Sequence, residues 1–131
     1  MDAGCPRVLR RQEGSAVVDF VLVLGLLLPL VLGIAQLCVY LYERNVVLAA
    51  VSEGARVAGA EGHDVPDGVS AARDLLQAGV GGNARRFVLR GERGTDRTVS
   101  IVAEGSFQAF VPFLPDLPVS VRASCHVEGR W

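Results

Sequence analysis

The sequence predicts a small α+β protein: a long N-terminal transmembrane helix that continues as an amphipathic stalk, then a short helix and an antiparallel sheet of about three strands. No side chain from Phe20 to Ala35 is polar. Apolar residues then recur at helical spacing to about residue 60, and after Gly82 their period changes to two. The 131 residues allow one span and one small domain, but not two independent cores.

The first 42 residues are expected to form a leader and a membrane span. Residues 1–14 are predicted to be a cytoplasmic leader, in which Gly4 and Pro6 argue against a stable helix, and residues 15–42 a transmembrane helix. Three arginines, at positions 7, 10 and 11, precede the apolar run, and only Arg44 follows it closely. The positive-inside rule therefore predicts a single pass through the cytoplasmic membrane, in contact with lipid, with residues 43–131 exported.

A secretory signal peptide would begin in the same way, but its apolar core is only about 7–15 residues long. The run in this chain continues to Tyr40 and Tyr42, whose aromatic rings suit the membrane interface. We therefore expect the span to be retained, although Val47-Leu48-Ala49 would be a passable cleavage site at an unusual depth.

One acidic residue, Asp19, lies near the start of the apolar run. An ionised carboxylate inside the apolar boundary costs on the order of 2–3 kcal/mol even on a lenient insertion scale, so it usually marks a function or a partner. The alternative is an interfacial acid in the first helical turn, where the helix dipole favours negative charge.

Three further residues distinguish the span from a uniform anchor. Pro29 predicts a kink or a local loosening of the helix, because it removes one backbone hydrogen bond. Gly25 and Gly33 lie four residues to either side, a spacing that lets a second helix approach closely. They could equally be tolerated glycines in an ordinary anchor.

After the span, the pattern predicts a stalk helix to about Ala60, with Glu43, Glu53 and Arg56 away from its apolar stripe. The stripe consists of Val47, Ala50, Val51, Gly54, Ala55 and Ala58. Residues 61–68 are expected to form an exposed turn, and their His63, Asp64 and Asp67 to be turn residues rather than metal ligands. Asp67 is expected to cap a short second helix, marked by Val69, Ala72, Leu75 and Leu76, that ends near Gly79.

Three strands are expected to follow. Residues 86–90 and 98–102 predict a hairpin around residues 91–97, and the proline-rich stretch 112–118, with Phe107, Phe110 and Phe113 around it, predicts an irregular loop. In the last strand, one set of alternating residues should face inward: Val119, Val121, Ala123, Cys125 and Val127. The stalk and the second helix are the elements available to cover that face.

Several classes of function are not indicated. The net charge is −1 and the arginines are scattered, which gives no case for nucleic acid as a partner. There is no glycine-rich phosphate loop, no His-Glu metalloprotease pair and no Gly-x-Ser-x-Gly elbow, so we expect neither an enzyme nor a cofactor or metal. His126 alternates outward on the last strand and is expected to be solvated.

The segment Gly14-Ser15-Ala16-Val17-Val18-Asp19-Phe20 resembles the cleavage site of type IV prepilin-like proteins. With the stalk segment 49–58 and the ending 113–123 followed by Glu128, it makes the chain resemble the TadE/TadF family of minor pilins, or pseudopilins, from tight-adherence (Flp-type) pilus systems. The family usually has Glu where this chain has Asp19. The shorter acid keeps the charge and moves it by about one methylene.

The resemblance implies a structural subunit of a bacterial cell envelope rather than an enzyme. A prepilin peptidase would cut between Gly14 and Ser15, and the mature chain would act in adhesion-pilus assembly together with other pilin-like subunits and the assembly platform. Asp19, Phe20, Gly25, Pro29 and Gly33 would then serve recognition or assembly. The alternative is a single-span, membrane-tethered binding or scaffold module; a membrane-anchored hydrolase is a distant third.

Overall fold

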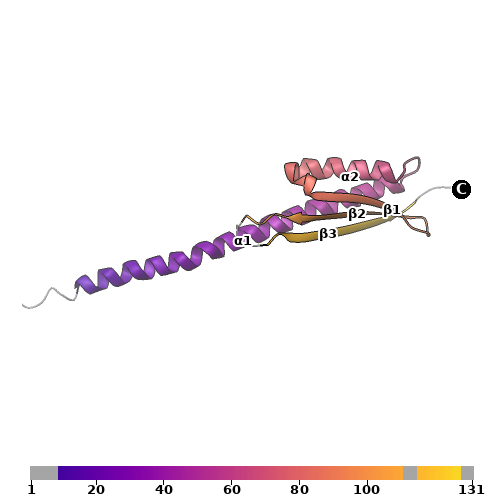
Figure 1. Ribbon diagram of the computed structural model, residues 1–131. Helices are drawn as coiled ribbons and strands as arrows, with labels where there is room; N and C mark the ends of the chain where they lie inside the picture. The colour runs from indigo at the N-terminus through magenta and orange to yellow at the C-terminus, as the bar shows by residue number, and fades with distance from the viewer. Residues whose placement is uncertain (1–8, 111–114, 128–131) are drawn as a thin grey trace, which may run out of the picture. The chain divides into compact units, whose positions relative to one another are not determined.

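The computed structural model describes residues 9–110 and 115–127, with side chains described from residue 14 onward. The chain divides into two compact units, Met1–Leu37 and Cys38–Trp131. The elements (Figure 1) are α1 (Leu9–Gly59), α2 (Val65–Val80), the 3-10 helix η1 (Gly81–Arg86), β1 (Phe87–Arg93), β2 (Thr98–Phe107) and β3 (Leu117–His126). The expected fold class, a long apolar helix followed by a short helix and a three-stranded antiparallel sheet, is confirmed.

Helix α1 begins at Leu9, so the expectation that the residues up to Glu13 form no stable helix is wrong for residues 9–13. Residues 9–13 are Leu-Arg-Arg-Gln-Glu, all good helix formers, and they extend the helix of the apolar run toward the N-terminus. The helix passes through Pro29 and ends at Gly59, close to the expected end. The rest of the leader, the loop residues 112–114 and Glu128 lie outside the described residues.

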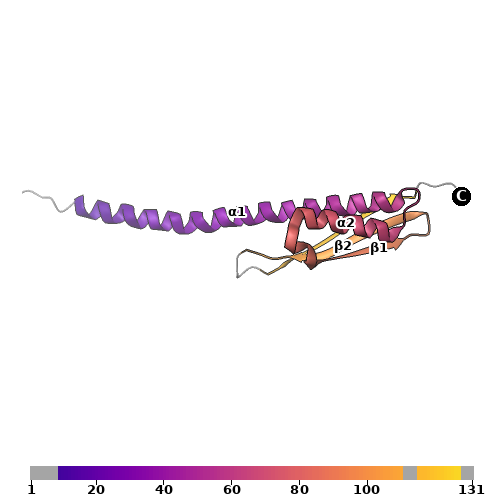
Figure 2. The same cartoon turned by 90° about the horizontal axis from the view of Figure 1, so that it is seen from above.

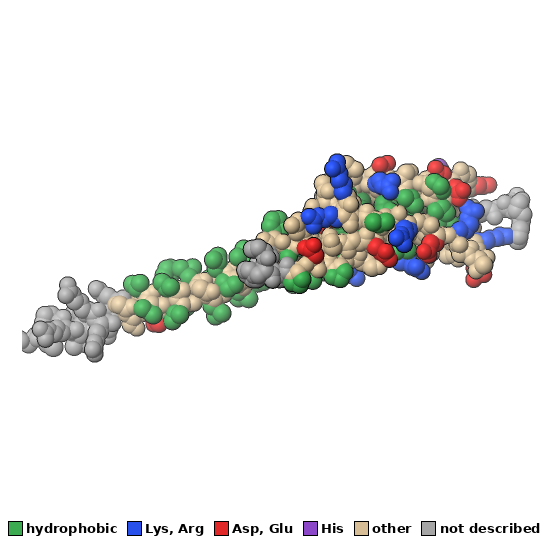
Figure 3. Space-filling view, viewed as in Figure 1, with side chains coloured by type: hydrophobic (Ala, Val, Ile, Leu, Met, Phe, Trp, Pro, Cys, Tyr) green, Lys and Arg blue, Asp and Glu red, His purple; other side chains and the backbone are tan. Residues whose placement is uncertain are grey.

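In the first unit, the described side chains of α1 are exposed up to residue 35, and Gln36 is the first buried one. Every side chain from residue 14 to residue 35 is exposed, including the large apolar ones (Figure 3). Soluble monomeric proteins rarely expose so large a continuous apolar surface. It is the surface expected of a helix surrounded by lipid tails.

In the second unit, the C-terminal part of α1 and the whole of α2 lie on one face of the sheet (Figure 2). The largest fully buried side chains are Val47 and Val51 from α1, Leu76 from α2, and Val99 and Ile101 from β2. The expected stalk stripe and the inner residues of α2 together form the helical side of a hydrophobic core. The sheet forms the other side.

The two helices of this unit approach most closely at Gly54 and Gly68 (α1 and α2). A Cβ placed on Gly68 would lie 2.3 Å from the backbone oxygen of Gly54, and one on Gly54 would lie 2.6 Å from that of Gly68. The Cδ1 atom of Ile101 lies 3.0 Å from either added Cβ. Only glycine at both positions lets the helices and the central strand meet at this point.

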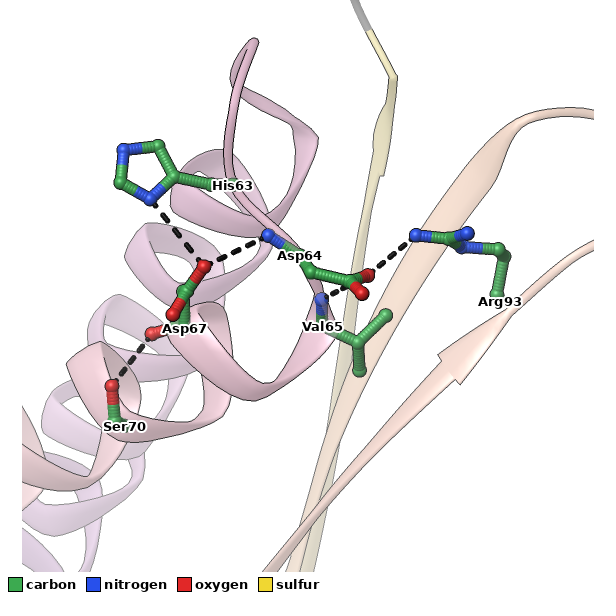
Figure 4. A network of polar contacts seen from close by, with 6 residues as sticks. All are labelled: His63, Asp64, Val65, Asp67, Ser70 and Arg93. Atoms are coloured by element: carbon green, nitrogen blue, oxygen red, sulfur yellow. Dashed lines mark hydrogen bonds and ion pairs between the residues drawn. The ribbon is translucent and has the colours of Figure 1, made fainter.

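Helix α2 begins at Val65, four residues before the expected start, and its N-cap is Asp64 rather than Asp67. Asp67 occupies the third helical position, where its Oδ2 accepts a hydrogen bond of 3.0 Å from the backbone N–H of Asp64, which completes a capping box (Figure 4). Pro66 stands in the first turn, where its missing N–H is no loss. The turn residues of the sequence are thus the first turn of a helix.

The cap is also tied to the sheet. Arg93, at the end of β1, donates a hydrogen bond to Oδ1 of Asp64, and His63 lies with its Nδ1 3.6 Å from Oδ2 of Asp67 (Figure 4). All of these side chains are exposed. The group that sequence patterns could present as a metal site is a helix cap joined to a strand end.

The sheet has the order β1-β2-β3, and both pairs are antiparallel. Strand β1 runs to Arg93, so the hairpin turn is shorter than the expected 91–97, and β2 runs on to Phe107. The backbone N–H of Gly94 donates to the oxygen of Thr98 at 2.7 Å and closes the turn.

The alternation predicted for the last strand is confirmed: Val119 and Val121 are buried, whereas Ser120, Arg122, Ser124 and His126 are exposed. On the outer face of the sheet, Val102 is only 6% exposed. It stands between Arg90 and Arg122 in the strand register. Long arginine side chains can shield a neighbouring apolar residue with their aliphatic stems.

Alanine normally stabilises a helix interior by roughly 0.8–1.0 kcal/mol relative to glycine. We expect Gly68→Ala to do the opposite, because its Cβ would overlap the Gly54 backbone oxygen. Overpacking costs typically about 1–3 kcal/mol, so the free energy of unfolding should fall by up to about 2 kcal/mol net, measured by denaturant unfolding of the detergent-solubilised chain. Gly82→Ala, whose Cβ meets nothing within 4 Å, is the control. A stabilising Gly68→Ala would contradict the close crossing.

Val121→Asp would place an unpaired charge against the helices, because Val121 is 8% exposed and faces the core. We expect a loss of about 3 kcal/mol or more and less folded protein, measured as resistance of the membrane-bound chain to protease. Ser124→Asp, on the exposed side of the same strand, should leave that resistance unchanged. If Ser124→Asp is the variant that loses resistance, the faces of β3 are assigned the wrong way round.

Candidate processing and assembly site

All residues singled out for processing or assembly lie on α1 within the first unit. The Gly14–Ser15 bond lies inside the helix, so the backbone must unwind there before a peptidase can bind it in an extended form. Gly14 makes this easier, since glycine weakens a helix by roughly 0.8–1.0 kcal/mol relative to alanine. Apart from its own helix backbone, nothing among the residues with described side chains lies within 4 Å of a Cβ placed on Gly14.

Asp19 is exposed and lies one helical turn after Ser15 on the same face of α1. The rise between them is roughly 6 Å along the helix axis. Among the residues whose side chains are described, no cation lies within ion-pair distance of Asp19. Its carboxylate is therefore available to a group from outside these residues.

Phe20 is 63% exposed and points roughly 100° around the helix axis from Asp19. It therefore belongs to a different face of α1 than the acid and Ser15. The structure does not bring these two recognition candidates together into one patch.

Gly25, Pro29 and Gly33 follow one another at four-residue spacing and share one face of α1. A Cβ added to Gly25 or to Gly33 would meet nothing within 4 Å. These glycines contrast with Gly54 and Gly68, whose small size is required by contacts within the chain. The face of Gly25 and Gly33 leaves room for another helix, as small residues do in membrane helix pairs.

Helix α1 is the one helix among the described residues that is long and apolar enough to cross a membrane, and none of its most apolar window is buried. Charged residues return after the apolar run, at Glu43 and Arg44. Near the C-terminal end of α1, Arg56 donates hydrogen bonds to Glu53 and lowers the pKa of that carboxyl. The pair is solvent-exposed, so its contribution to stability is small.

One buried acid was misplaced by sequence reasoning. Glu43, expected away from the apolar stripe of the stalk, is only 7% exposed, and its Oε1 accepts a hydrogen bond of 3.0 Å from Nδ2 of Asn83 in η1. It lies four residues before Val47 and therefore on the same face of α1. The sequence shows this four-residue spacing, so the signal that could have placed Glu43 on the apolar stripe is present in it.

No group of three or more His, Cys, Asp or Glu side chains within the described ranges is placed to hold a metal ion. His126 is exposed on β3, as expected from its position in the alternation. This region of α1 presents the Gly14–Ser15 bond and the Asp19 carboxylate one turn later. It also presents the open face at Gly25 and Gly33, which we call the notch.

Comparison with known proteins supports one family. A family model described as TadE-like protein matches residues 14–56. The match begins at Gly14, includes every candidate site residue and ends in the stalk, whereas the ending 113–123 lies outside it. No curated protein and no solved structure matches the chain. The resemblance predicted from the sequence is thereby confirmed, and residues 14–56 of this chain form a TadE-like segment.

Proposed function

We propose that the chain is a minor pilin-like subunit that a prepilin peptidase cuts after Gly14 and that then joins, or primes, a tight-adherence pilus or a related secretion apparatus. The TadE-like segment indicates a Tad pilus-associated, single-pass membrane protein, and proteins of this kind are in general not enzymes. The observation that carries the proposal is that this segment begins at Gly14 and contains Asp19 and the glycines Gly25 and Gly33. Among the described residues, the carboxylate has no ion-pair partner and a Cβ added to either glycine meets nothing within 4 Å.

The proposed role of Asp19 follows from its position one turn after the proposed cut. Cleavage would create an ammonium group on Ser15, and in an assembled bundle the ammonium of a neighbouring subunit could approach Asp19. In a weakly hydrated setting such a pair is worth more than a surface ion pair. It would fix the axial register between helices rather than add much stability.

The partners of the proposed subunit are the prepilin peptidase, other pilin-like subunits and the assembly platform. The arginines before the apolar run would keep the N-terminus in the cytoplasm, where the peptidase acts on it, and place the second unit outside. The notch of Gly25 and Gly33 would receive the helix of a neighbouring subunit.

Asp19→Asn keeps the shape of the side chain and removes its charge. We expect the variant to insert in the membrane normally but to lose either cleavage or pilus assembly, whereas Asp19→Glu should retain both. The measurement is the mass of the membrane-bound protein, which reports the cut after Gly14, beside a count of pili. Asp74→Asn, at an exposed acid of α2, is the matched control. If Asp19→Asn is cut and assembles like the parent, Asp19 is an ordinary helix-terminus acid.

Filling the notch should separate folding from assembly. In the double variant Gly25→Leu with Gly33→Leu, a Cβ added at either position meets nothing within 4 Å among the described residues, so the protein should accumulate and resist protease like the parent. Pilus assembly should fall about tenfold or more, because the neighbouring helix can no longer approach. Ala35→Leu, a similar enlargement on another face of α1, should assemble normally. Normal assembly of the double variant would favour a plain membrane anchor.

A further inference from the structure

The second unit contains a pocket of about 340 Å³ that none of the proposed roles uses. It is lined by Glu43, Asn83, Phe107, Gln108, Ala109 and Phe110. Phe107 forms a fixed wall, since it is 3% exposed and its ring packs edge-on against Tyr40 with the ring centroids 5.9 Å apart. Phe110 forms an open wall and is 81% exposed.

The acid in this pocket lacks a cationic partner among the residues with described side chains. Glu43 is 93% removed from solvent, yet only the neutral amide of Asn83 bonds to it, through one of its two oxygens. A buried carboxylate is normally satisfied by a cation or by several donors. The pocket, which Phe107 and Phe110 also line, therefore offers a carboxylate to a cationic ligand.

A guanidinium lies beside the same pocket. Arg86, in η1, donates a hydrogen bond of 2.5 Å from Nη2 to Oε1 of Gln108, which lines the pocket, and Arg86 itself is exposed. A guanidinium has five N–H donors, so most of them remain for an anion. The site thus combines a carboxylate inside the pocket with an arginine at its edge, a pair that fits a ligand carrying both an ammonium and a phosphate group.

The position of Glu43 along α1, just after the apolar run, indicates the source of such a ligand. The 23 residues from Phe20 to Tyr42 rise roughly 34 Å as a helix, against a hydrocarbon core of about 30 Å. Glu43 is the next residue along α1, so it enters the layer of lipid headgroups. At that level phospholipid headgroups are the most abundant ligands that carry phosphate and ammonium together.

We propose that this pocket binds the headgroup of an ethanolamine phospholipid: its ammonium donates to Glu43 and its phosphate accepts from Arg86. A primary ammonium supplies N–H donors to the buried carboxylate, which the quaternary ammonium of a choline lipid lacks. A glycerol headgroup lacks the cation altogether. The proposal needs α1 to span a membrane, but it does not need cleavage after Gly14 or assembly of a pilus.

The test is native mass spectrometry of the full chain, purified from micelles with equal amounts of ethanolamine, choline and glycerol phospholipids. The parent should retain the ethanolamine lipid about tenfold more than the choline lipid, the size expected for one hydrogen bond to a charged group. Glu43→Gln can still accept from Asn83 and should remove that preference. Glu104→Gln, at an exposed acid of β2, is the control and should keep it. Arg86→Gln should lower the retention of every phospholipid and leave the ratio unchanged.

Equal retention of the three lipids by the parent would overturn the proposal, as would an unchanged preference in Glu43→Gln. If Glu43→Gln does not fold, lipid retention by Phe110→Ser is the deciding measurement. Phe110 is 81% exposed, so its replacement should not unfold the domain. Phe110→Ser should reduce retention of the ethanolamine lipid severalfold, and parent-like retention would contradict the pocket. If Glu43→Gln instead loses cross-links to a neighbouring protein with lipid retention unchanged, the pocket holds a protein cation and the lipid proposal is wrong.

Discussion

The contact between the backbones of Gly54 and Gly68 determines how the second unit is built. Because neither residue has a side chain, α2 can lie directly on α1, and the side chain of Ile101 reaches both glycines from the central strand. The helices thereby form one surface, which the inner face of the sheet covers. Cys38 and Cys125 are free thiols and do not cross-link this unit. A domain of this size therefore depends on such dense packing.

Much of this arrangement could be predicted from the sequence, because the local patterns are strong. The apolar run, the stripe that begins at Val47 and the alternation after Pro118 each have one clear period, and the structure follows all of them. The start of α2 at Val65, before the expected cap Asp67, has a physical reason. Pro66 and Gly68 are turn formers in most contexts, and only the reciprocal cap of Asp64 and Asp67, together with the contact to α1, makes them helical.

The functional residues were harder to place than the elements, because the same residue types serve different purposes. Gly25 and Gly54 look alike in the sequence, yet Gly54 packs directly against α2, whereas a Cβ added to Gly25 would meet nothing within 4 Å. Glu43 and Glu53 lie ten residues apart on one helix, yet the first is buried and the second pairs with Arg56 on the surface. Such differences arise from contacts distant in the sequence, which periodicity does not reveal.

The sheet has two edge strands, β1 and β3, and this limits how copies of the domain can meet when they are crowded together. An open edge can pair with another chain and lead to strand exchange or aggregation, unless charges or prolines obstruct it. Here β1 carries Arg90, Glu92 and Arg93, and β3 has Pro118 at its second position and Arg122 at its middle. Copies of the domain are therefore discouraged from joining through these strand edges, so the proposed subunits would have to meet through other surfaces.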